Sequence, residues 1–188
     1  MASSSWRSCL ALGFALALAG CGAEETEPKS CDAECQDAVA ARGLRDVVKL
    51  VYNLTLQGNF IGPQDETTRC PHGGSASVVG VATSVPEQGA TELELGYSFE
   101  QCAYQHKDDD AHESYDVVIS GTLGEKGILA VQPTATTALL FASLGISIEG
   151  TVFDPPVPYS EIECTFELAQ NGNNLSGTWC ERKVGFEL

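Results

Sequence analysis

Positive charge is scarce in this chain of 188 residues. Ten Lys and Arg residues stand against 26 Asp and Glu residues, which gives a formal net charge of −16 at pH 7. Such a field repels the phosphates of nucleic acids and the head groups of anionic lipids. The composition therefore excludes nucleic acid as a natural partner, and we expect the negative charge to serve mainly solubility.

The chain also lacks an apolar run that is long enough to cross a membrane as a helix. Residues 10–19 and 138–148 are largely apolar, but about 20 such residues are needed to span a hydrocarbon core of ~30 Å. The first run has the length of the apolar region of a secretory signal peptide. The second run is expected to form a core strand.

Motifs that mark enzymes are missing as well. The sequence contains no phosphate-binding loop, no dinucleotide-binding fingerprint and no G-x-S-x-G nucleophile elbow. His72 lies in Cys70-Pro71-His72-Gly73-Gly74, which is typical of a tight turn. We therefore predict no catalytic residues and no cofactor, and a hydrolase with scattered catalytic residues is kept as an alternative.

The N-terminal segment carries the one motif that points to a known class of proteins. Arg7 precedes the apolar run, and Leu18-Ala19-Gly20-Cys21 ends it. This arrangement resembles the lipobox of bacterial lipoprotein precursors, over residues 1–22. The resemblance implies that residues 1–20 are a signal peptide, and that Cys21 carries a diacylglycerol and an acyl chain such as palmitate. An ordinary signal peptide, cleaved after Ala19 or Gly20, is the alternative.

A lipidated Cys21 would hold the mature protein on a membrane, because two buried chains already anchor a protein stably. Lipoproteins with Asp after the cysteine are often retained at the inner membrane, and here Gly22 follows. The resemblance thus implies the bacterial cell envelope and favours the outer membrane, on its periplasmic or surface face. Residues 21–30 are expected to form the lipidated N-terminus and an acidic tether of at most ~30 Å.

Six cysteines remain for the globular domain expected at residues 31–188: Cys31, Cys35, Cys70, Cys102, Cys164 and Cys180. An even number in an exported chain predicts disulfides, and six cysteines permit 15 connectivities. Two pairs are suggested by turns between their members, namely Cys70 with Cys102 and Cys164 with Cys180. The second pairing sets Phe166 opposite Thr178, whereas a register one residue away sets it opposite Gly177 and suits the core better.

The rest of the sequence predicts an α+β fold that is mainly β. Apolar residues at three- and four-residue steps, from Ala40 to Leu54, indicate one amphipathic helix at about 36–57. Alternating patterns from about 70 to 188 indicate an antiparallel meander of about seven or eight strands, either an open curved sheet or a barrel. The expected strands include 75–85, 93–99, 115–123, 127–133, 136–142, 146–153, 162–168 and 175–187.

Short echoes suggest internal repetition within this β-rich region. A polar-Gly-Thr-apolar order recurs around Gly121, Gly150 and Gly177, and Cys102-Ala103-Tyr104 resembles Cys164-Thr165-Phe166. A glycine inside each strand would mark strong bending or close packing. Chance similarity between short strands is the alternative.

The most polar segment, residues 105–113, contains the candidate ligands for a metal ion. Asp108, Asp109 and Asp110 are consecutive and lie between two histidines, but the order lacks the spacing of a calcium loop. We expect a solvated hairpin loop and no metal.

These observations favour a non-enzymatic envelope lipoprotein, a structural or binding module that contacts the membrane through its lipid. Its other partner would be an envelope protein or a small ligand. The alternative is a carrier of a small ligand, if the sheet closes around a cavity.

Overall fold

The computed structural model describes residues 30–56 and 61–188. The chain divides into residues Met1–Ser30 and a compact unit, Cys31–Leu188. Cys21 and the rest of the lipobox lie outside the described residues. No helix in the described part of the chain has the length and apolarity needed to cross a bilayer.

Helix α1 spans Ala33–Leu56 and begins earlier than the sequence predicts. Asp32 caps it, because its side chain accepts a hydrogen bond from the amide of Cys35 at 3.0 Å. Most of the expected apolar stripe is buried, but Leu54 is 50% exposed and Leu56 is buried instead. The prediction for Leu54 is therefore wrong, since this side chain turns away from the core.

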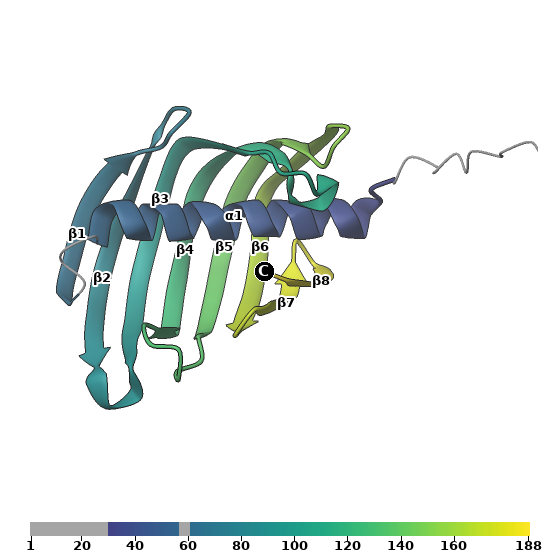
Figure 1. Ribbon diagram of the computed structural model, residues 1–188. Coiled ribbons are helices and arrows are strands. Elements are labelled where there is room, and N and C mark those ends of the chain that lie inside the picture. Colours follow the sequence, from purple (N-terminus) through teal and green to yellow (C-terminus); the bar gives the residue numbers. More distant parts are fainter. Residues whose placement is uncertain (1–29, 57–60) are drawn as a thin grey trace, which may run out of the picture. The chain divides into compact units, whose positions relative to one another are not determined.

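Eight antiparallel strands follow, and each pairs with the next along the chain. The sheet is open, with β1 and β8 at its two edges, so the open curved sheet rather than the barrel is correct. Figure 1 shows α1 lying across the concave face of this sheet. The strands are β1 Gly62–Arg69, β2 Ser75–Val85, β3 Ala90–His106, β4 Tyr115–Ala130, β5 Ala138–Val152, β6 Val157–Asn171, β7 Asn174–Trp179 and β8 Arg182–Glu187.

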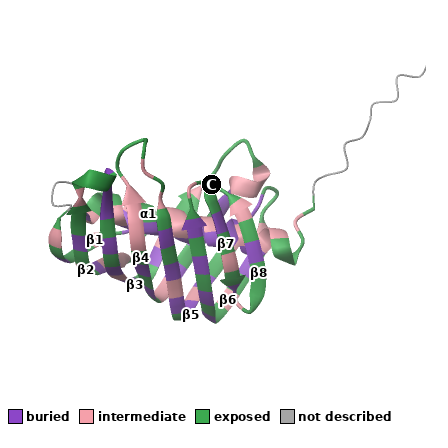
Figure 2. Ribbon diagram, turned by 90° about the horizontal axis from the view of Figure 1, so that it is seen from below, coloured by how far each residue is buried: buried purple, intermediate pink, exposed green. Residues whose placement is uncertain are grey.

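One face of the sheet packs on α1 and the other faces solvent. Along β3 the side chains of Leu93, Leu95, Tyr97 and Phe99 are buried. The polar side chains that alternate with them, such as Glu94, are exposed. The same alternation runs along the neighbouring strands (Figure 2). This pattern is the one expected for an antiparallel sheet with one wet face.

Several expected strands have different bounds, and backbone geometry explains the differences. Segments 115–123 and 127–133 are joined in β4, and 136–142 and 146–153 are joined in β5. Segment 175–187 is instead divided into β7 and β8, because Cys180 and Glu181 have φ of 46° and 69° and form a tight turn. Strand β1 was not expected, since only one of its residues is buried.

The repeated glycines mark close packing, as predicted. Gly121 and Gly150 lie within β4 and β5 with φ of 118° and 147°. A Cβ atom at Gly150 would lie 2.0 Å from the carbonyl oxygen of Asp116, and one at Gly121 would lie 2.7 Å from that of Gly145. Any side chain at these places would displace the neighbouring strand.

The cysteine echo has a structural basis in two β-bulges. Gln101 and Glu163, the residues directly before Cys102 and Cys164, have φ of 50° and 55°. Their amides donate hydrogen bonds to the hydroxyls of Ser120 at 3.2 Å and Ser147 at 3.4 Å. Each bulge turns the following cysteine into the core.

Residues on either side of the second bulge differ from the sequence prediction in their burial and strand pairing. Ile162 was expected on the buried face but is 68% exposed, because the bulge at Glu163 breaks the alternation. Beyond it, Phe166 lies opposite Trp179, so both registers considered from the sequence are wrong. The Cys164–Cys180 disulfide nevertheless forms, because Cys180 lies in the turn just beyond β7.

A buried polar network ties the start of α1 to the last strands. Asp37 is 1% exposed. It accepts hydrogen bonds from the hydroxyl of Tyr159 at 3.0 Å and from Nη2 of Arg182 at 2.8 Å. The indole of Trp179 donates to the Tyr159 oxygen at 2.8 Å. These bonds help to hold the helix at a fixed place on the sheet.

Candidate binding site

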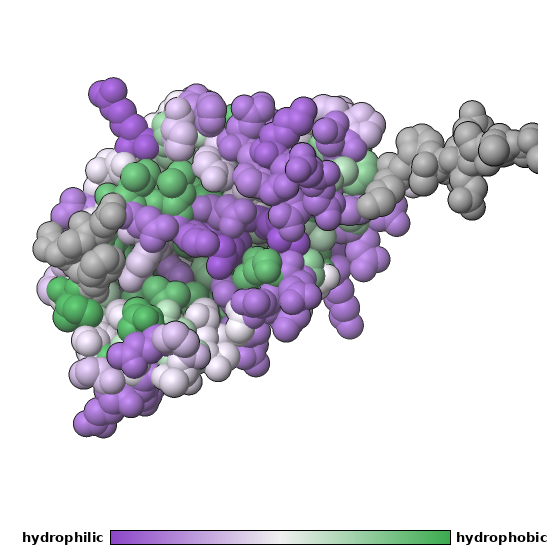
Figure 3. Space-filling view, viewed as in Figure 1, coloured by the Kyte–Doolittle hydropathy of each residue, from purple (hydrophilic) through white to green (hydrophobic). Residues whose placement is uncertain are grey.

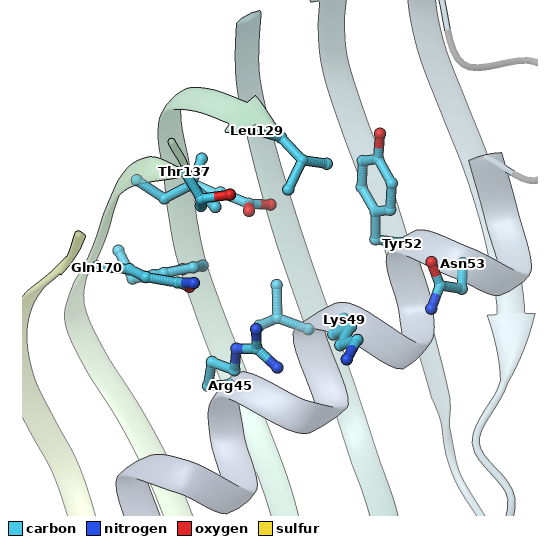
Figure 4. Close-up of a pocket in the computed structure, with 11 residues that line it drawn as sticks. Arg45, Lys49, Tyr52, Asn53, Leu129, Thr137 and Gln170 are labelled. Atoms are coloured by element: carbon cyan, nitrogen blue, oxygen red, sulfur yellow. The ribbon is translucent and has the colours of Figure 1, made fainter. Parts of the chain in front are cut away.

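A cavity of about 160 Å³ lies between α1 and the concave face of the sheet. We call it the helix–sheet pocket. Its helix side and its strand side are drawn in Figure 4, and a hollow below the helix can be followed in Figure 3. It is lined by Arg45, Val48, Lys49, Tyr52, Asn53, Glu125, Leu129, Thr137, Leu139, Phe141 and Gln170.

The spacing of the lining residues follows from the elements that carry them. Arg45, Lys49 and Tyr52 recur at four- and three-residue steps, so they share one flank of α1. On the sheet, Glu125 of β4 pairs with Phe141 of β5, and Leu139 of β5 pairs with Gln170 of β6. The pocket is therefore made by one helix flank and three adjacent strands.

The walls are mainly apolar, and the polar atoms of the strand side already have partners. Gln170 donates its side-chain amide to the carbonyl of Gly172 at 2.9 Å. The hydroxyl of Thr137 accepts the amide of Ala130 at 3.2 Å. The part of the wall formed by Val48, Leu139 and Phe141 offers only carbon atoms to an occupant.

Among the described residues that line the pocket, Glu125 is the one acidic side chain, and it is 5% exposed. The hydroxyl of Tyr97 donates a hydrogen bond to its Oε2 at 2.6 Å. Burial raises the pKa of Glu125 to about 7, although the bond from Tyr97 and the charge of Arg45 act in the opposite direction. This carboxyl therefore changes its charge near neutral pH.

The two tyrosines near Glu125 stay protonated. Burial is the main cause that raises the pKa of Tyr97 and of Tyr52, and the nearby Glu125 raises both further. Their hydroxyls are therefore neutral groups that can donate hydrogen bonds.

The two cations of the pocket lie on α1. Arg45 forms an ion pair of 3.2 Å with the adjacent Asp46. Lys49 is exposed and has no ion pair within residues 30–56 and 61–188. By contrast, Arg42, one turn before Arg45, binds Glu113 at 3.2 Å and lies over the ring of Phe186 at 4.9 Å.

The six cysteines form three disulfides: Cys31–Cys35, Cys70–Cys102 and Cys164–Cys180. Both pairs that the sequence suggested are confirmed. The third joins two residues at the start of α1, where Sγ of Cys35 lies 3.4 Å from Nδ1 of His112.

The acidic segment forms a loop with a short 3₁₀ turn, Ala111–Glu113. Asp110 caps this turn by accepting the amide of His112 at 3.0 Å, and Asp108 accepts the amide of Asp109 at 2.6 Å. Ligand atoms of His106, Asp108 and Glu113 lie within 4.8 Å of one another. Since Glu113 is already paired with Arg42, we treat this group as part of the loop structure.

The pocket residues Arg45, Lys49 and Glu125 were not predicted from the sequence. A signal for Glu125 was present, since it occupies an inward place of a strand between Leu123 and Leu129. A charged residue at such a place is unusual and needs a partner. No comparable signal marked Arg45 and Lys49, because charged residues on a helix flank are common.

Comparison with protein families, curated proteins and solved structures finds no match for this chain. Function is therefore argued from the site itself.

Proposed function

We propose that this protein is an envelope lipoprotein whose folded domain is a non-enzymatic binding module. Its helix–sheet pocket is the binding site for a small ligand. The lipobox-like segment and the three disulfides support an exported, lipid-anchored chain. The pocket, with its apolar walls and one buried carboxyl, is the observation that carries the binding role.

The place of the cavity favours a binding module over a carrier. The carrier considered from the sequence required a sheet closed around its cargo, and the sheet is open. The cavity lies instead between α1 and the sheet, where a ligand would contact one flank of the helix and the strands opposite it. A binding module fits this geometry better than a carrier that encloses its ligand.

Binding to this pocket is testable without knowledge of the natural ligand. We expect benzyl alcohol, a small neutral probe, to shift the NMR amide signals of Tyr52, Leu129 and Thr137 in the mature chain with Cys21→Ser. Leu129→Trp should fill the cavity and abolish these shifts. Leu144→Trp is the matched control, because Leu144 is 95% exposed and does not line the pocket.

Two results would overturn the proposal. One is that no lining residue responds to the probe. The other is that Leu129→Trp and Leu144→Trp leave the same response, because the probe would then bind elsewhere.

A further inference from the structure

We propose that the occupant of the helix–sheet pocket is a small organic anion. Its apolar body would lie between α1 and β5, and its carboxylate or other anionic group would lie at Arg45 and Lys49. This inference rests on the proposed function, since it names the ligand class of the same pocket.

The distribution of positive charge favours an anion at this cavity. The protein has ten Lys and Arg against 26 Asp and Glu, yet two cations line this one cavity. They are four residues apart on α1, so they lie one above the other on its flank. An anion at this place meets a local attraction that is rare on so acidic a protein.

Arg45 and Lys49 have spare capacity to bind an anion, unlike the neighbouring Arg42. Arg42 is held by Glu113 and also donates to the backbone carbonyl of Glu187 at 2.6 Å. Lys49 has no ion pair among the described residues, and the one pair of Arg45 is with Asp46. Asp46 also accepts the hydroxyl of Tyr115 at 2.9 Å, so its charge is shared. Arg45 keeps donors for a carboxylate, which guanidinium groups bind well.

The size and chemistry of the interior favour a compact apolar body for the ligand. A cavity of ~150 Å³ lined by aliphatic and aromatic side chains holds a benzene ring, and the helix–sheet pocket measures about 160 Å³. Val48, Leu139 and Phe141 give it apolar walls. The body of the ligand is therefore an aromatic ring or a short branched chain, with the charged group left at the cations.

Glu125 makes this binding dependent on pH. The groups that face it are Tyr97 from β3, and Tyr52 and Arg45 from α1. Its pKa of about 7 means that it is mostly neutral at slightly acid pH, when it does not repel an anion. Above neutral pH the ionised carboxylate repels the ligand, so affinity falls as the pH rises.

The test compares three aromatic probes of similar size and different charge: benzoate, benzyl alcohol and benzylamine. Calorimetric titrations use the mature chain with Cys21→Ser, at low ionic strength and at about pH 6. We expect benzoate to bind about tenfold more tightly than benzyl alcohol, as charge-assisted hydrogen bonds to a cation allow. The preference should shrink in Arg45→Gln and Lys49→Gln and vanish in the double variant. Lys126→Gln is the control, because Lys126 lies on the opposite face of β4 and pairs with Glu94 at 3.6 Å.

A second measurement follows pH. The affinity for benzoate should fall between pH 6 and pH 8 in the parent chain, and this fall should be largely absent in Glu125→Gln. Equal affinities for the three probes, or tightest binding of benzylamine, would overturn the anion assignment and leave the pocket as a binding site. Binding of none of the probes would overturn the proposed function as well.

Discussion

The buried carboxyl of Glu125 makes a quantitative prediction about stability. Its pKa rises from its usual value of 4.5 to about 7 in the folded protein. Between these pH values the folded state keeps a proton that the unfolded chain releases. The stabilising contribution is therefore complete below pH 4.5 and is lost as the pH rises through 7. At about 1.4 kcal/mol per pKa unit, the loss is roughly 3 kcal/mol.

Glu125→Gln should remove this loss, because the amide stays neutral and its oxygen still accepts the hydrogen bond from Tyr97. Relative to the parent, the variant should gain about 3 kcal/mol of unfolding free energy between pH 4.5 and pH 8. For a domain of this size, the gain in Tm is about 6–12 °C.

The assay is urea unfolding of the oxidised mature chain with Cys21→Ser, at half-unit steps of pH. The difference between variant and parent cancels the pH dependence of the other acidic residues. Glu167→Gln is the matched control, because Glu167 lies on the exposed face of β6 and should give a difference that does not change with pH. A flat difference for Glu125→Gln would refute the buried, proton-holding carboxyl.

Three further predictions concern the scaffold and the acidic loop. Replacing both cysteines of the Cys70–Cys102 pair by Ala should lower the free energy of unfolding by roughly 4 kcal/mol, and the same change at Cys31–Cys35 should lower it by roughly 2 kcal/mol. The losses differ because the sequence separations are 32 and 4. Equal losses in urea unfolding would contradict this. Asp37→Ala should cost about 1–3 kcal/mol, because it leaves the buried hydroxyl of Tyr159 without its acceptor, whereas the half-exposed Arg182 keeps its ion pair with Glu161. Glu34→Ala at an exposed place on the same helix should cost little; a similar Tm for both variants would count against the network. Millimolar calcium or zinc should move the Tm by less than about 2 °C, and a larger rise that Asp108→Asn abolishes would reveal a cation site in the loop.

The sequence predicted the architecture because hydrophobic periodicity is a local property. The helix stripe and the alternation in Leu93, Leu95 and Tyr97 depend only on near neighbours along the chain. The places where prediction failed depend on contacts between strands. Ile162 is exposed because the bulge before Cys164 depends on the pairing of β6 with β5. The register of β6 with β7 depends on the turn that pairs Asn171 with Asn174.

The pocket could not be predicted from the sequence, because it too depends on contacts between distant parts of the chain. It exists because α1 crosses the sheet at one particular place, which is fixed by contacts such as that of Gly43 with Tyr115. A Cβ at Gly43 would lie 3.2 Å from the Tyr115 ring, so this glycine lets helix and sheet approach closely. Arg45 and Lys49 became candidates only when that crossing placed them beside Glu125.

The most direct test of the account is the intact mass of the protein extracted from the membranes of a bacterium that exports it. We expect the mass of residues 21–188, increased by a diacylglyceryl group and an acyl chain on Cys21, and reduced by the six hydrogens lost in three disulfides. A mature chain with an unmodified Cys21, or a chain that still begins at Met1, would contradict the lipid anchor on which the proposed function depends.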